Sequence, residues 1–170
     1  MDLPRGASMK TMQRLVVALG ILCPFGLCHL AVAGERDAGK GNKSDKIDGL
    51  LQVAAAYKAD RDLSKTEEYL LKVLELDGNN VKAGAELAWV NNEKGQFDKA
   101  TALALATVAV DNNYGPAWRE LGFALLMRKD YVNAAKALKK AIEIDPADKD
   151  ARGYLDKVQD ASLVARRRAA

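Results

Sequence analysis

The most regular feature of the chain is a repeated alternation of apolar and polar positions. Apolar residues recur at helical spacing in segments that short polar turns separate. The runs LELDGNN, VAVDNNY and IEIDPAD contain Asp77, Asp111 and Asp145, which are evenly spaced along the chain. A period of about 34 residues predicts a stack of helical hairpins, each packed against the next. Aligned on the aspartates, the chain divides into three units, 47–80, 81–114 and 115–148.

The third unit carries the clearest signature, and the second unit diverges most from it. In the third unit, bulky, small and turn residues stand where one known repeat family has residues of the same kind. They are Trp118, Leu121, Gly122, Ala134, Ala141 and Pro146. The chain therefore resembles the tetratricopeptide repeat (TPR) family. The resemblance implies an all-α fold, a right-handed α-solenoid of three helix-turn-helix units with a C-terminal capping helix.

Other segments agree with a stack of this kind. Residues 98–110 are apolar nearly all round, as expected of a helix packed on both sides. Residues 149–170 have one apolar face and a polar back, which predicts a capping helix with a basic tail. At the turns, Ser64 with Glu67 predicts a capping box that opens a helix, and Gly95 is a permissive turn residue.

The segment 1–33 resembles a secretory signal peptide. A positive flank precedes an unbroken apolar run, and Ala31 and Ala33 offer the small side chains that a signal peptidase accepts. We expect cleavage before Gly34 and export to the bacterial periplasm. The alternative is an uncleaved leader that anchors the protein to the inner membrane, because the apolar stretch is long enough to span a bilayer. Residues 34–46 are polar and glycine-rich, which predicts a flexible linker.

Loss of the leader restricts the available chemistry. Cys23, Cys28 and His29, which are both cysteines and the sole histidine, lie within it. The remaining chain has no thiolate nucleophile, imidazole base or Cys/His metal site, and we expect no cofactor. The leader also holds three of the 26 basic and one of the 23 acidic residues. The near-balanced charge that remains argues against nucleic acid as a partner.

The resemblance also indicates where a partner would bind. In the family, the first helix of each unit lines a concave groove, and Trp89 and Phe123 hold equivalent positions on it in adjacent units. We expect them to anchor a peptide, unless the capping helix folds over the groove and buries them. Neighbouring positions complete the candidate partner-binding groove, which comprises Leu51, Lys58, Lys82, Trp89, Asn92, Glu93, Arg119, Phe123, Leu126 and Met127.

One known use of such a groove is not expected here. The family's best-known groove holds a partner's C-terminal carboxylates with Lys, Asn and Arg at set positions. In this sequence none of those positions carries the required residue, since they hold Leu51, Ala55, Glu86, Pro116 and Glu120. A receptor for chaperone tails is therefore not the expected function.

Taken with the leader, these features predict a non-catalytic scaffold or adaptor. We expect it to hold a peptide or helix of another envelope protein, and the resemblance implies a pilus, secretion or cell-wall assembly as the context. One alternative is a self-associating subunit whose groove receives a segment of a neighbouring copy. A less favoured alternative is an enzyme that uses carboxylates, although the chain shows no recognisable catalytic motif.

Overall fold

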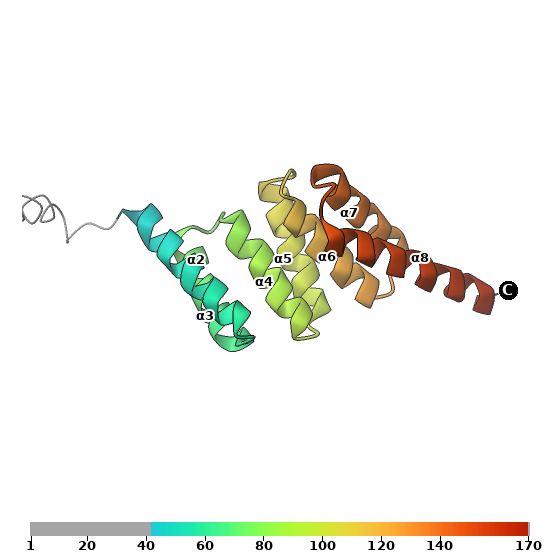
Figure 1. Cartoon of the computed structure of the whole chain (residues 1–170), viewed down its shortest axis with the longest axis horizontal. Coiled ribbons are helices and arrows are strands. Elements are labelled where there is room, and N and C mark those ends of the chain that lie inside the picture. Colours follow the sequence, from blue (N-terminus) through green and yellow to red (C-terminus); the bar gives the residue numbers. More distant parts are fainter. Residues whose placement is uncertain (1–41, 170) are drawn as a thin grey trace, which may run out of the picture. The chain divides into compact units, whose positions relative to one another are not determined.

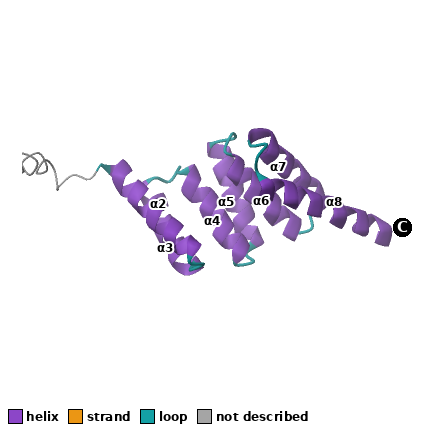
Figure 2. Ribbon diagram, viewed as in Figure 1, coloured by secondary structure: helices purple, strands orange, loops and turns teal. Residues whose placement is uncertain are grey.

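The computed structural model describes residues 42–169. Within this range the secondary structure is entirely helical, and helices follow one another along the long axis of the stack (Figures 1 and 2). The predicted all-α solenoid is confirmed, with three helical hairpins (α2/α3, α4/α5 and α6/α7) followed by α8. The helices are α2 (Lys43–Ala59), α3 (Leu63–Leu76), α4 (Val81–Glu93), α5 (Phe97–Val110), α6 (Gly115–Met127), α7 (Tyr131–Ile144) and α8 (Lys149–Ala169).

Two sequence predictions concern the N-terminal part of the chain. The leader, residues 1–33, lies outside the described residues, as do residues 34–41 of the expected linker. The last four linker residues, 43–46, instead form the first turn of α2, where the N–H of Lys46 donates to the backbone oxygen of Asn42. This turn is exposed and polar, so no apolar periodicity marked it as helical.

The aspartates that define the repeat have a structural task at the junction between units. The carboxylate of Asp77 accepts the N–H of Asn79, and that of Asp111 accepts the N–H of Asn113. In the same way, the carboxylate of Asp145 accepts the N–H of Ala147. An aspartate side chain that caps its own turn in this way holds the chain as it leaves one helix pair and enters the next. The regular spacing of the aspartates therefore reflects one turn, built three times.

The turns within the hairpins repeat as well. Arg61, Gly95 and Lys129 lie one repeat period apart, and each has a positive φ, of 57°, 71° and 65°. In each turn the N–H of the following residue reaches back five residues to a helix carbonyl, as in a Schellman motif. The prediction of a permissive turn at Gly95 is confirmed, whereas the other two turns force a side chain into the left-handed region.

The predicted capping box at Ser64 is wrong. Helix α3 begins at Leu63, and the carboxylate of Asp62 accepts the N–H of Lys65 at 3.0 Å. Asp62 competes for the same site two residues earlier, and an aspartate is at least as good an N-cap as a serine. Asp130 caps α7 in the same way.

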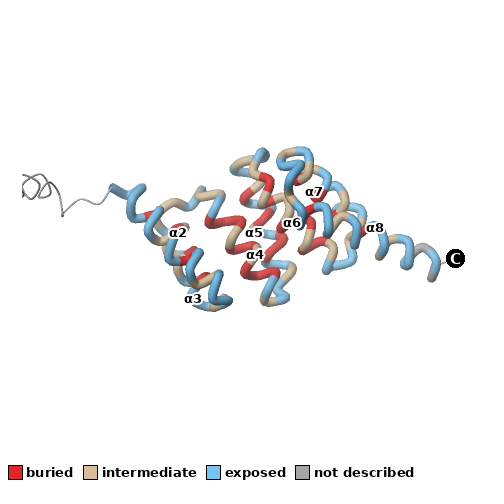
Figure 3. The backbone as a smooth tube through the Cα atoms, viewed as in Figure 1, coloured by how far each residue is buried: buried red, intermediate tan, exposed pale blue. Residues whose placement is uncertain are grey.

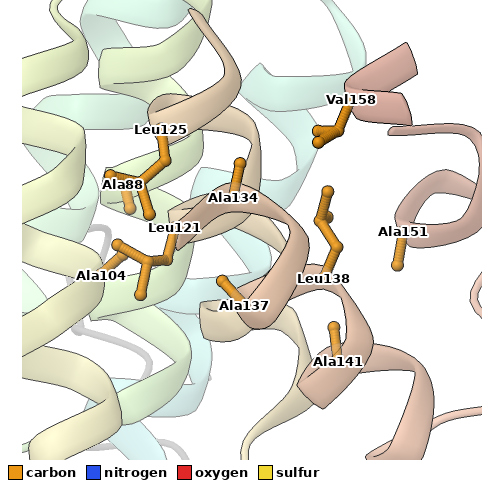
Figure 4. Packing of buried hydrophobic residues seen from close by; sticks show 10 residues of the cluster. All are labelled: Ala88, Ala104, Leu121, Leu125, Ala134, Ala137, Leu138, Ala141, Ala151 and Val158. Atoms are coloured by element: carbon orange, nitrogen blue, oxygen red, sulfur yellow. The ribbon is translucent and has the colours of Figure 1, made fainter. Parts of the chain in front are cut away.

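The core follows the stack from one hairpin to the next, and burial is deepest along its middle (Figure 3). Close approach of paired helices requires small residues: a Cβ added at Gly122 would lie 2.5 Å from Cγ of Leu138. Leu138 is fully buried between α6 and α8, where it points toward Ala151 and Val158 of the capping helix (Figure 4). The third unit and α8 thus share one core, as the capping prediction required.

Helices in the stack differ in how closely they approach one another. The first helices, α4 and α6, pack directly against each other, and α8 packs against α6 and α7. No comparable contact joins the second helices α5 and α7 in the described chain. The second helices therefore diverge and leave space between them. This geometry creates two faces, which we call the inner face (lined by α2, α4 and α6) and the outer face (formed by α3, α5 and α7).

Candidate functional site

The inner face is held together by a contact that recurs between successive units. Lys58 forms an ion pair with Glu86, and one unit later Asn92 donates to the Oε2 atom of Glu120 at 3.0 Å. Lys58 and Asn92 are equivalent positions, as are Glu86 and Glu120, since one repeat period separates the members of each pair. At both junctions the twelfth residue of one unit therefore contacts the sixth residue of the next. We call this arrangement the polar ladder.

The second rung of the ladder is buried. Asn92 and Glu120 are each only 4% exposed, and Asn92 also donates to the backbone oxygen of Glu120 at 3.1 Å. Burial raises the pKa of Glu120 above its ordinary value, even though Arg119 and Asn92 stabilise the charged form. The prediction that Asn92 lines an open groove is wrong, because its side chain is turned into the junction with α6.

Arg119 connects this rung to the capping helix. Its Nε atom lies 3.1 Å from Oε1 of Glu120, and one of its terminal nitrogens lies 3.0 Å from the carboxylate of Asp148. Asp148 in turn accepts the N–H of Ala151 at the start of α8. The sequence places Arg119 at the edge of the groove, but its guanidinium is committed to two carboxylates of its own chain.

The two aromatic residues expected as anchors have different surroundings. The ring of Phe123 lies 4.8 Å from the ring of Tyr154 on α8 and 6.4 Å from that of Phe97. The capping helix α8 therefore covers Phe123, which is the alternative that the sequence left open. Trp89 is half-buried and packs against the core of the first two units. The Nζ atom of Lys58 lies over its ring, 4.2 Å from the ring centroid.

The N-terminal half of the inner face contains two adjoining hollows. The smaller one, about 40 Å³, lies between α2 and α4, and Lys58 and Glu86 form one part of its wall. The larger one, about 650 Å³, opens at the N-terminal ends of the same helices. The two hollows adjoin, since Leu51 and Lys82 line both of them. This half of the face remains accessible, whereas Tyr154 occupies the other half.

The other candidate residues are spread along the edges of the face. Lys82 and Glu93 are exposed, and Glu93 lies 3.8 Å from Arg61 of the preceding unit. Met127 is 46% exposed at the end of α6, while Leu126 packs against the core. The structure thus places Leu51, Lys58 and Lys82 on one hollow, with Trp89 beside Lys58, and the rest elsewhere.

Sequence reasoning missed three residues that shape the face. Glu86 and Glu120 stand out in the sequence only as departures from the family's carboxylate-binding pattern, although their separation by one repeat period is a usable signal. Tyr154 extends the same series, because it lies one further period after Glu120 and faces Phe123. Its position follows from the rule that α8 takes the place of a fourth first helix.

The described residues contain neither a candidate metal site nor a candidate membrane span. From residue 42 to 169 no three His, Cys, Asp or Glu side chains gather in a way that could hold a metal ion. None of the helices described combines the length and apolar character that crossing a bilayer requires. The strongest polar cluster, around Glu120, holds the units in register through Asn92 and Arg119, although the buried Oδ1 atom of Asn92 has no hydrogen-bond partner among the described residues.

Comparisons with known proteins agree with this arrangement. The family described as Tetratricopeptide repeat matches residues 115–148, the unit that carries the sequence signature. The chain is similar to the Sgt2 TPR domain from Aspergillus fumigatus, with 26% identity and a TM-score of 0.69 over 74% of this chain and 84% of that one.

Two further solved structures show the same fold. The first TPR of Spaghetti (RPAP3), bound to the HSP90 peptide SRMEEVD, has 20% identity and a TM-score of 0.66 over 71% of this chain and 95% of that one. A mutant of Thermobaculum terrenum O-GlcNAc transferase has 23% identity and a TM-score of 0.67. There, 70% of this chain aligns with only 23% of the other, so the likeness is confined to part of that enzyme.

Proposed function

Because this chain is a tetratricopeptide-repeat protein, we propose that it is a non-catalytic scaffold or adaptor that holds a peptide or helix of a partner protein. The binding region is the open N-terminal half of the inner face. The observation that carries the proposal is the pair of adjoining hollows between α2 and α4, both lined by Leu51 and Lys82, beside which Lys58 covers Trp89. Apolar anchors with a charged rim are typical of peptide grooves.

The inner face favours a partner other than an acidic C-terminal tail. Spaghetti's first TPR binds the HSP90 peptide SRMEEVD, which ends in several carboxylates. In this chain Glu86 lies on the face where such a tail would lie, and the nearby cation Lys58 is already paired with it. Like charges brought together at an interface disfavour binding. A synthetic peptide ending in EEVD is therefore expected to bind no more tightly than a scrambled peptide.

Affinity capture tests the proposal. The full chain is expressed with an affinity tag, and captured proteins are compared between the parent and two variants, Lys82→Glu and Trp89→Ala. We expect both to lose the same partners, because one changes an exposed rim charge and the other removes the anchor. Val132→Ala, at a 68% exposed position on α7, serves as the matched control and should retain them. Unchanged capture by a folded Lys82→Glu variant and by Trp89→Ala would reject this binding region.

The cellular context is a separate part of the proposal. We propose that the leader directs export to the bacterial periplasm, where the scaffold serves an envelope assembly such as a pilus, secretion or cell-wall machine. The support is the sequence of residues 1–33 alone. Fractionation of cells that express the full chain, with N-terminal sequencing of the product, is expected to find a periplasmic protein that begins at Gly34. A full-length product in the membrane fraction would instead establish an anchored form.

Self-association is the alternative that the open hollow also permits. A second copy could insert a segment into the same face. Light scattering across a wide range of concentrations tests this alternative, because self-association raises the apparent mass as the concentration rises. A dimer that Lys82→Glu dissociates would replace the partner proposal.

A further inference from the structure

A further apolar hollow, away from the inner face, lies between the second helices α5 and α7. It encloses about 610 Å³, within the range of sites that bind ligands or peptide side chains. Trp118, Leu121 and Leu125 of α6 line it, and Leu105 of α5, 50% exposed, lines it as well. We call this hollow the outer groove. It shares no residue with the candidate groove of the inner face.

The charge along the outer groove has a single sign. Among the described residues that line it, the charged ones are Lys136 and Lys140, both on α7. Lys136 makes no ion pair within the described chain, and Lys140 lies 3.1 Å from Glu143 in an exposed pair. An exposed pair of that kind contributes little and can be exchanged for another carboxylate. The groove therefore combines an apolar floor with a basic edge.

The equivalent position one unit earlier provides an internal comparison. The hollow between α3 and α5 encloses about 180 Å³ and has no charged lining residue within the described chain. Gly84 stands there in place of Trp118, and Ala102 and Ala106 stand in place of the two lysines. The tryptophan floor and the basic edge are therefore features of this groove and do not follow from the repeat.

The dimensions of the groove limit what can occupy it. Along α7 its lining runs from Asn133 to Lys140, a rise of about 10 Å at 1.5 Å per residue. This length accommodates about two turns of a helix. Lys136 and Lys140 are one turn apart, so carboxylates four residues apart on a helix lying alongside α7 would face them in register.

We propose that the outer groove binds a short amphipathic helix of a partner protein, with an apolar stripe that contacts Trp118 and Leu105 and acidic side chains that pair with Lys136 and Lys140. Helices commonly bind in grooves between two other helices through anchors at i, i+3 or i+4, and i+7. The outer groove would then be a second binding surface, independent of the inner face. The protein could hold two partners at once.

The chain contains two tryptophans, one at each surface, and this allows a direct test. In the full chain, Trp89→Phe leaves Trp118 as the sole tryptophan reporter of the outer groove, and Trp118→Phe leaves Trp89 as the reporter of the inner face. The probe is a synthetic 16-residue helix with leucines at i, i+3, i+4 and i+7 and glutamates four residues apart beside them. A matched probe has lysine in place of every glutamate.

We expect the acidic probe to shift the emission of Trp118 and leave that of Trp89 unchanged. The lysine probe should produce no shift, and added salt should weaken the acidic probe. In the Trp89→Phe background, Lys136→Glu with Lys140→Glu should weaken binding at least about tenfold, since two ion pairs become repulsions. Lys99→Glu with Lys139→Glu, at exposed positions on the same two helices that do not line the groove, should bind as the parent does.

Three results would overturn the proposal. The first is a response of Trp89 alone, which would place the probe on the inner face. The second is equal binding by the reversed-charge variant and its control, which would remove the role of the lysines. The third is a response of Trp118 to dodecanoate but not to the acidic helix, which would make the groove an acyl-chain site. Failure of the inner-face proposal would leave the Trp118 measurement unaffected.

Discussion

The three hairpin turns contain an internal experiment on backbone strain. Arg61, Gly95 and Lys129 occupy the same turn in successive units, with φ between 57° and 71° and the same backward hydrogen bonds. An L-residue in this region costs about 1–2 kcal/mol, which glycine avoids. Glycine also has more freedom to lose on folding, about 0.5–1 kcal/mol. Lys129→Gly should therefore stabilise the fold by about 0.5–1 kcal/mol, although glycine in helices normally destabilises.

Urea unfolding followed by circular dichroism at 222 nm measures the change in the free energy of unfolding. In thermal unfolding of a unit of this size, 1 kcal/mol corresponds to a shift of about 3–5 °C in Tm. Arg61→Gly should act in the same direction, with a small loss from its weak pair with Glu93, which lies 3.8 Å away. Lys129→Ala is the matched control, because alanine keeps the strain, and its stability should stay close to that of the parent.

The reverse substitution completes the series. Gly95→Ala introduces the strain that the other two turns already carry and should destabilise the protein by about 1 kcal/mol. The reasoning is refuted if Lys129→Gly lowers the free energy of unfolding by about 1 kcal/mol, the ordinary penalty for glycine in a helix. It is also refuted if Lys129→Ala stabilises as much as Lys129→Gly, since the gain would then come from losing the lysine side chain.

Three further predictions concern the core, the buried carboxylate and the capping helix. Leu138→Ala should destabilise by about 2–5 kcal/mol in urea unfolding because it leaves a cavity, whereas Val132→Ala, 68% exposed, should change stability by less than about 0.5 kcal/mol. Burial makes the pKa of Glu120 higher in the folded than in the unfolded chain. Between the two pKa values the folded state binds more protons, so the contribution of Glu120 to stability falls as the pH rises. Glu120→Gln should remove that fall. Measured by urea unfolding from about pH 4 to about pH 7, the free energy of unfolding of the variant should therefore rise relative to that of the parent, and a difference that stays constant with pH would contradict this reasoning. In a double-mutant cycle, Phe123→Ala and Tyr154→Ala should show a coupling of about 0.5–1.5 kcal/mol, and a coupling near zero would mean that the two rings do not support each other.

The repeat register could be predicted because it depends on local chemistry. Asp77 and its equivalents mark a turn that is specified within a few residues, and Gly122 marks the close approach of two adjacent helices. The N-cap of α3 was missed although it is also local. Asp62 and Ser64 are both good capping residues, and only the actual start of the helix chooses between them.

The candidate site could be predicted only in part, because a register assigns a face but not what the next unit contributes to it. Trp89 and Phe123 hold equivalent positions, yet Tyr154 covers only Phe123 because α8 reaches only the last unit. The sequence predicts Asn92 as a groove residue, and its burial depends on Glu120 in the next unit. Neither outcome can be read from the helix that carries the residue.

The polar ladder also bears on how many units such a chain can hold. Residues 81–114 carry both halves of a rung, with Glu86 as the acceptor for the preceding unit and Asn92 as the donor to the following one. A second copy of this segment, inserted after residue 114, would meet the first copy through an asparagine and a glutamate at the same positions as Asn92 and Glu120. The new junction would repeat the asparagine–glutamate contact of a native rung, although Ala85 stands where Arg119 pairs with Glu120. The rung therefore sets the register in which whole units add, and the arginine beside it distinguishes the last junction from a copied one.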